Sequence, residues 1–187
     1  IEAVRQIDAH HLDRIRAIHA QFEREFQPGQ HPLVAQLRDR FRHEVDASAL
    51  LCIAGGHVAI LLNRLRIAGL LEVWDPNKPI VAWGAGSMVL AERVVVFHDS
   101  PPQGHGNAEV FEAGFGLVRG IVPLPHARTR LELDVPHRVE MFARRFAPDA
   151  CLTLETGSRL DYLDGEWQGV SELDRLGVDG RLVEVSA

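Results

Sequence analysis

The chain has 187 residues, of which 46% are hydrophobic and 25% charged, and this composition is typical of a globular protein with one sizeable core. Its formal net charge of −6 argues against a nucleic-acid partner, because affinity for phosphates comes largely from clustered Lys and Arg. The sequence has no run of about 18 apolar residues and no signal-peptide pattern at its start. We therefore expect a cytoplasmic protein with no membrane partner.

Two amphipathic helices are predicted in the first 47 residues. Between residues 9 and 26, apolar side chains recur at three- and four-residue steps, which places them on one helical face: Leu12, Ile15, Ile18, Phe22 and Phe26. Residues 27–32 interrupt this pattern with two prolines and a glycine. A second stripe then repeats every four residues: Leu33, Leu37, Phe41 and Val45. We expect a helical hairpin over residues 1–47, followed by an α/β domain over residues 48–187.

The second domain alternates short apolar runs with helical patterns, which is typical of parallel βαβ units. Strands are predicted over residues 50–54, 80–83, 93–97, 121–124 and 151–154. The first of these is uniformly apolar, so we expect it to be buried on both faces, together with its thiol Cys52; Cys151 is also expected to be a buried free thiol. The fold class predicted is α/β: a three-layer, doubly wound, mainly parallel sheet, ending in a small antiparallel ribbon.

A further helix is predicted after Asp134, which can cap it, with Pro136 in the first turn. Its buried face is expected to contain Val139, Phe142 and Phe146.

Small residues follow two of the predicted strands, at the sheet edge where ligands bind in open parallel sheets. Gly55, Gly56 and His57 follow the first strand and could direct backbone N–H groups at an anion. Residues 83–87 (Trp-Gly-Ala-Gly-Ser) follow the next strand and resemble a nucleophile elbow, the tight turn that carries a catalytic side chain between a strand and a helix.

Four segments in this order resemble the dipeptidase E and cyanophycinase family of serine peptidases, which has a class I glutamine amidotransferase-like fold. They are residues 50–57, 81–87, 123–126 (Pro-Leu-Pro-His) and 154–157 (Leu-Glu-Thr-Gly), and the resemblance spans residues 49–163. It implies an oxyanion turn, a nucleophile elbow, a catalytic histidine and an acidic residue at these places.

The resemblance assigns roles to individual residues. It places Gly84 at the nucleophile position, where a hydroxyl is therefore missing, and His126 at the histidine position. The acid aligns with Thr156, or with Glu155 after a shift of one residue. The candidate ligand-binding residues are Gly55, Gly56, His57, Ala85 and Ser87. Ser87 lies about one helical turn, some 5 Å, beyond the elbow tip, so a capping or packing role is expected for its hydroxyl.

The segment 97–106 contains residue types that suit zinc. His98, Asp99 and His105, with His126, are the candidate ligands, but their spacing matches no tight ligand motif. We predict no metal and no cofactor. We expect the loop over residues 99–106 to border the cleft that contains Gly55, Gly84 and His126.

Three functions are compatible with these residues. The first is a catalytically degenerate domain that binds a small peptide-like or carboxylate ligand, or a partner chain. The second is an active hydrolase in which His126 acts as base, Glu155 orients it, and Ser87 or an activated water attacks. The third is a structural role, in which the helical hairpin is the contact of a homo-oligomer.

Overall fold

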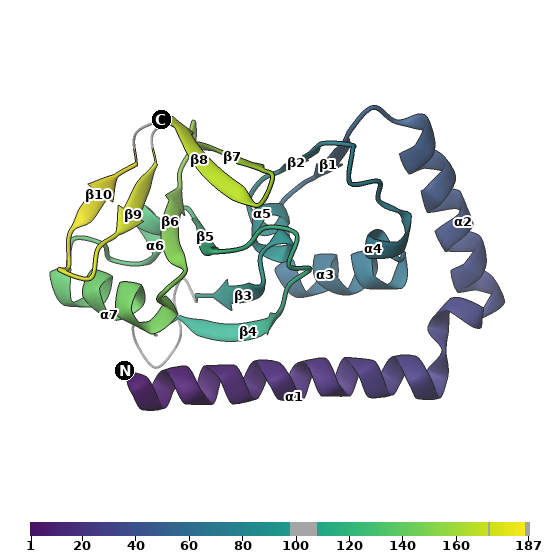
Figure 1. Cartoon of the computed structure of the whole chain (residues 1–187), viewed down its shortest axis with the longest axis horizontal. Coiled ribbons are helices and arrows are strands. Elements are labelled where there is room, and N and C mark those ends of the chain that lie inside the picture. The colour runs from purple at the N-terminus through teal and green to yellow at the C-terminus, as the bar shows by residue number, and fades with distance from the viewer. Residues whose placement is uncertain (98–107, 172, 186–187) are drawn as a thin grey trace.

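The computed structural model describes residues 1–97, 108–171 and 173–185. It is a mixed α/β arrangement in which a body of short strands and helices lies above one long N-terminal helix (Figure 1). None of the helices in the described ranges has the length and apolar character needed to cross a membrane.

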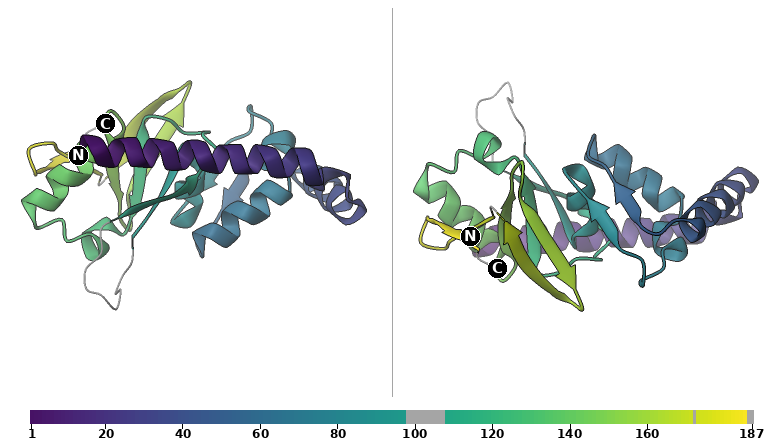
Figure 2. Two further views of the ribbon diagram at one scale, coloured as in Figure 1. Left: turned by 90° about the horizontal axis from the view of Figure 1, so that it is seen from below. Right: turned by 90° about the horizontal axis from the view of Figure 1, so that it is seen from above.

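Both N-terminal helices form, but they do not form the hairpin that the sequence predicts. Helix α1 (Glu2–Phe26) and helix α2 (Pro32–Ala47) are joined by a 3₁₀ turn, η1 (Pro28–Gln30). Helix α2 turns away from α1, so the two helices do not lie side by side (Figures 1 and 2). The reason is that each helix packs against a different part of the body: α1 contacts β4 and α7, and α2 contacts α4.

The first unit of the body is a parallel pair of strands, β1 (Leu51–Ile53) and β2 (Ile80–Ala82). Three helices belong to this unit: α3 (Val58–Ile67), α4 (Leu70–Val73) and α5 (Ala85–Leu90). Ile53 is buried with apolar residues of these helices, whereas Cys52 is exposed. The prediction that this strand and its thiol are buried is therefore wrong for Cys52, because the sheet is covered on only one face.

A second pair of strands is antiparallel. Strand β3 (Arg93–Val96) pairs with β4 (Glu109–Ala113), and a register shift interrupts the pairing after Val94. Strand β3 lies where the sequence predicts a strand, but its antiparallel partner follows no clear sequence pattern.

The largest sheet has the order β10-β9-β6-β5. Strands β5 (Ile121–Pro125) and β6 (Ala150–Leu154) are parallel, and β9 (Asp174–Leu176) and β10 (Leu182–Glu184) extend the sheet in antiparallel fashion. Strands β7 (Arg159–Leu163) and β8 (Glu166–Ser171) form a separate antiparallel hairpin. The C-terminal antiparallel ribbon that the sequence predicts is thus present.

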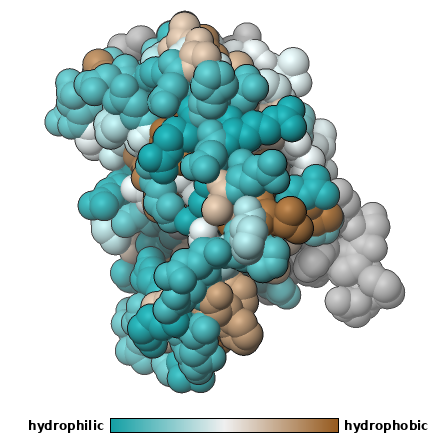
Figure 3. Space-filling model, turned by 90° about the vertical axis from the view of Figure 1, so that its right-hand side faces the viewer, coloured by the Kyte–Doolittle hydropathy of each residue, from teal (hydrophilic) through white to brown (hydrophobic). Residues whose placement is uncertain are grey.

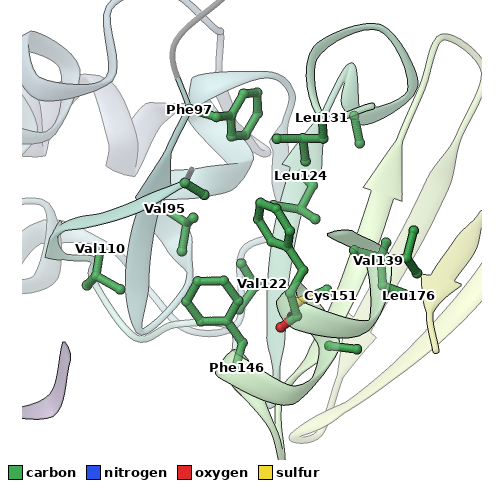
Figure 4. Close-up of a cluster of buried hydrophobic side chains, with 14 of the residues drawn as sticks. Val95, Phe97, Val110, Val122, Leu124, Leu131, Val139, Phe146, Cys151 and Leu176 are labelled. Atoms are coloured by element: carbon green, nitrogen blue, oxygen red, sulfur yellow. Dashed lines mark hydrogen bonds between the residues drawn. The ribbon is translucent and has the colours of Figure 1, made fainter. Parts of the chain in front are cut away.

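The main core lies between this sheet and helix α7 (Pro136–Phe146) (Figure 4). Val139, Phe142 and Phe146 are buried as predicted, and Cys151 lies among them. The helix begins after Val135 without a side-chain cap, so the prediction that Asp134 caps it is wrong.

The described strands form four separate sheets, two of which contain a parallel pair. The α/β class is therefore observed, whereas a continuous parallel sheet between two helical layers is not seen in these ranges.

Candidate functional site

Gly84 forms a sharp turn between strand β2 and helix α5. Its backbone angles are φ 56° and ψ −128°, a region that costs side-chain-bearing residues about 1–3 kcal/mol. The amide of Gly86 donates to the Trp83 carbonyl at 3.0 Å, and the amide of Ser87 donates to the Gly84 carbonyl at 3.1 Å. This strand-to-helix geometry is the one expected of a nucleophile elbow.

The turn after β1 packs directly against this elbow. A Cβ atom built on Gly55 would lie 3.4 Å from both the Ala85 amide nitrogen and the Trp83 carbonyl oxygen. The contact follows from the parallel pairing of β1 and β2, whose register brings Ile53 opposite Ala82, so both chains leave the sheet at the same edge. Two of the predicted ligand-binding segments are therefore brought together.

Three other candidate residues also lie here. Gly56 and His57 are exposed, and His57 precedes α3 without donating or accepting a capping hydrogen bond through its side chain. The Ser87 hydroxyl donates to the Gly84 carbonyl oxygen at 2.7 Å. This bond occupies the Ser87 proton within the turn, as expected of a packing or capping hydroxyl.

His126 and Glu155 follow neighbouring parallel strands. The register pairs Pro125 with Leu154, and the His126 amide donates to the Leu154 carbonyl at 3.0 Å. His126 has left-handed backbone angles (φ 55°, ψ 36°) at the start of helix α6 (Ala127–Arg130), and it is exposed. The histidine and the acidic segment therefore emerge at one edge of the sheet.

The Glu155 carboxylate is turned toward the segment that contains His126. Its Oε1 atom accepts a hydrogen bond from the backbone N–H of Arg128 at 2.8 Å, and its own amide donates to the Ser158 hydroxyl at 2.9 Å. Thr156, the alternative acid position, is exposed in the following turn. Sequence reasoning missed Arg128 and Ser158, because the backbone N–H and hydroxyl that hold Glu155 belong to no motif.

Two arginines lie on helix α6 beside His126. Arg128 forms an ion pair with Asp174 of strand β9, and the Arg130 guanidinium lies over the Phe97 ring, 4.4 Å from its centroid. The Arg128 charge is therefore paired within the fold, at the edge where His126 emerges.

Helix α5 connects the two halves of the candidate site, because it begins at the Gly84 turn and packs against β5, the strand that ends before His126. Within the described ranges, no hydrogen bond joins Gly55 or Gly84 to His126 or Glu155. An open hollow of about 470 Å³ lies elsewhere, lined by Arg119, Gly120 and the turn of the β7–β8 hairpin. Since Gly120 precedes β5, this hollow is at the opposite end of that strand from His126.

The structure provides no metal centre in the residues it describes, where no three His, Cys, Asp or Glu side chains are grouped as ligands. His98, Asp99 and His105, with the loop over residues 99–106, lie outside the described residues.

No model of a known protein family matches this chain, and no curated protein matches it significantly in sequence.

Proposed function

We propose that this chain is a dipeptidase E-like domain with a degenerate active site that binds a small peptide-like or carboxylate ligand without hydrolysing it. In this proposal the two parallel pairs, β1–β2 and β5–β6, belong to one doubly wound arrangement. Gly55, Gly84, His126 and Glu155 then face a common cleft.

The observation that carries the proposal is the backbone of Gly84. An elbow conformation is retained there, with the neighbouring Gly55 turn in contact, although the residue at its tip has no side chain. A turn of this kind keeps backbone N–H groups directed at a bound carbonyl or carboxylate oxygen. Without a nucleophile, such a site retains binding and at most the modest catalysis that oxyanion stabilisation provides, about 10³- to 10⁴-fold over water.

His126 supplies the second recognition element. Its imidazole is exposed at the carboxyl edge of β5, so a ligand carboxylate placed there meets a hydrogen-bond donor. Glu155 is held by the Arg128 amide and fixes the segment that presents the histidine.

The hydrolase alternative requires a different nucleophile. Ser87 already donates its proton to the Gly84 carbonyl, and this bond favours the binding role. Attack by an activated water is the other route to hydrolysis. The amount of intact peptide must therefore be measured over time.

The experiment is saturation-transfer NMR with pooled dipeptides and free amino acids, on the unaltered protein, on His126→Ala and on His137→Ala. His137 is an exposed histidine on α7 and serves as the matched control. We expect a saturation-transfer signal from a dipeptide or a carboxylate, which should be lost in His126→Ala and kept in His137→Ala. The ligand should remain intact after prolonged incubation. Binding that survives His126→Ala unchanged contradicts the proposed site, and steady cleavage contradicts the degenerate assignment.

A further inference from the structure

The apolar stripes of α1 and α2 are buried at one end and exposed at the other. On α1, Leu12 is 6% exposed where the helix crosses the body, whereas Phe26 near its end is 67% exposed. On α2 the order is reversed: Leu33 at the start is 70% exposed and Val45 at the end is 5% exposed. Each helix therefore extends beyond the surface that buries its stripe.

The two exposed ends meet at the turn η1, which joins the helices. We call this surface the apolar corner and define it by Ile18, Phe22, Phe26, Leu33 and Leu37, all exposed. The Phe22 and Phe26 rings are in contact, with centroids 5.0 Å apart. The corner lies away from the strands of the body (Figure 1), and the side of the molecule that carries α2 shows hydrophobic areas on a largely hydrophilic surface (Figure 3).

We propose that the apolar corner is the contact between two copies of this chain. Because the stripes continue without interruption from the buried face of each helix, the same helical ridges that pack against the body are available to another helix. Two copies related by a twofold axis would pack corner against corner and bury both sets of side chains, and such twofold dimers are the commonest oligomers.

The charges around the corner suit a contact between identical surfaces. The chain as a whole carries a net charge of −6, so most faces of two copies repel each other. Beside the corner, Glu23 and Glu25 of α1 carry negative charge and Arg40 of α2 carries positive charge, all exposed. Two copies can therefore approach here with residues of both signs at the rim, which is the arrangement that pairs opposite charges across an interface.

The exposed area sets the expected size of the interface. A large apolar residue presents roughly 200 Å² when fully exposed. With the five residues of the corner between 45% and 70% exposed, each copy offers on the order of 500 Å². The dimer then buries about 1,000 Å² in total, which is the lower limit for a specific interface. We therefore expect a weak dimer whose population depends on protein concentration.

Analytical ultracentrifugation across a wide concentration range tests this contact. The unaltered protein should show a reversible monomer–dimer equilibrium, and Phe26→Glu or Leu33→Glu should weaken dimerisation roughly tenfold or more, since each places a charge in the contact. The control is Leu163→Glu, which changes an equally exposed leucine, at 73%, on the β7–β8 hairpin and should leave the equilibrium unchanged.

Three results overturn the proposal: a monomer at every concentration, a dimer that survives both charged variants, or a dimer that Leu163→Glu disrupts equally. The substituted side chains are exposed, so circular dichroism should show folded variants. Ligand signals that depend on His126 should be the same in Leu33→Glu, so this test is independent of the proposed binding function.

Discussion

The Cα atom of Gly55 lies 3.3 Å from the position that a Cβ atom on Gly84 would occupy. At this distance a side chain on Gly84 fits only if one of the two turns shifts by a few tenths of an ångström. The absence of a side chain on Gly84 thus has two consequences: it leaves no hydroxyl at the tip of the turn, and it lets the two turns pack closely. Under the proposed function, the missing hydroxyl leaves a site that binds its ligand without attacking it.

Gly86 should not tolerate even a methyl group. A Cβ atom there would lie 2.1 Å from the Ile53 carbonyl oxygen, a backbone atom at the end of β1. We expect Gly86→Ala to lower the free energy of unfolding by at least about 3 kcal/mol, measured by urea titration. The control is Gly120→Ala, which has a positive φ of 73° but no neighbouring atom within 4 Å, and it should cost only about 1–2 kcal/mol. Equal losses in the two variants would disprove the close approach of α5 to β1.

The attachment of α1 to the body should depend on Asp8. Its carboxylate accepts two hydrogen bonds of 2.7 Å from the Arg145 guanidinium, which also donates to the Ala108 carbonyl. Both side chains are largely buried, so Asp8→Ala leaves an unpaired charge and should destabilise the fold by about 3–5 kcal/mol in urea.

The control for Asp8 is another aspartate on the same helix. Asp13 forms an exposed pair with Arg16 at 3.3 Å, so Asp13→Ala should change the stability by less than about 1 kcal/mol. If the two variants are equally stable, the Asp8–Arg145 pair does not hold α1 in place.

Stability above pH 9 should report on Cys151. Burial raises the pKa of its thiol to about 12. The unfolded chain therefore loses this proton from about pH 9, while the folded chain keeps it, so the free energy of unfolding should fall by about 1.4 kcal/mol per pH unit up to pH 12. The stability difference between the unaltered protein and Cys151→Ala, measured by urea titration at increasing pH, should shrink by that amount. A difference that stays constant with pH would show that the thiol is not buried.

The sequence predicts individual elements better than their pairing. Strands β5 and β6 and helix α7 lie where apolar runs and Pro136 place them, because burial on both sides leaves a strong local pattern. The open face of β1 was not predictable, since the exposed Cys52 is as apolar as the buried Ile53. The separation of α1 from α2 depends on contacts with residues distant in sequence, such as the bond from Arg145 to Asp8 of α1. The periodicity of apolar residues does not reveal such contacts.

In the candidate site, too, the sequence predicts local features better than the contacts between them. The glycines were identifiable from motifs, and their contact follows from parallel pairing of β1 with β2. The hydrogen bond from the Arg128 amide to Glu155 could not be predicted, because any residue type can supply a backbone N–H. The assignment of the acid position to Glu155 or to Thr156 stays a prediction.

Labelling with a fluorophosphonate probe tests most directly whether the missing hydroxyl at Gly84 leaves the site inactive. Such a probe reacts with a serine that a neighbouring base activates. Gly84→Ser places a hydroxyl at the elbow tip, at a cost of about 1–3 kcal/mol for the strained backbone. The required controls are Gly84→Ser with His126→Ala, and Gly84→Ser with Ser87→Ala.

We expect the unaltered protein to remain unlabelled and Gly84→Ser to be labelled. Adding His126→Ala should abolish that labelling, because the base is lost, whereas adding Ser87→Ala should leave it intact. The contradicting result is an unaltered protein that is labelled and loses its label in Ser87→Ala, because Ser87 would then be an active nucleophile and the site would be that of a working hydrolase.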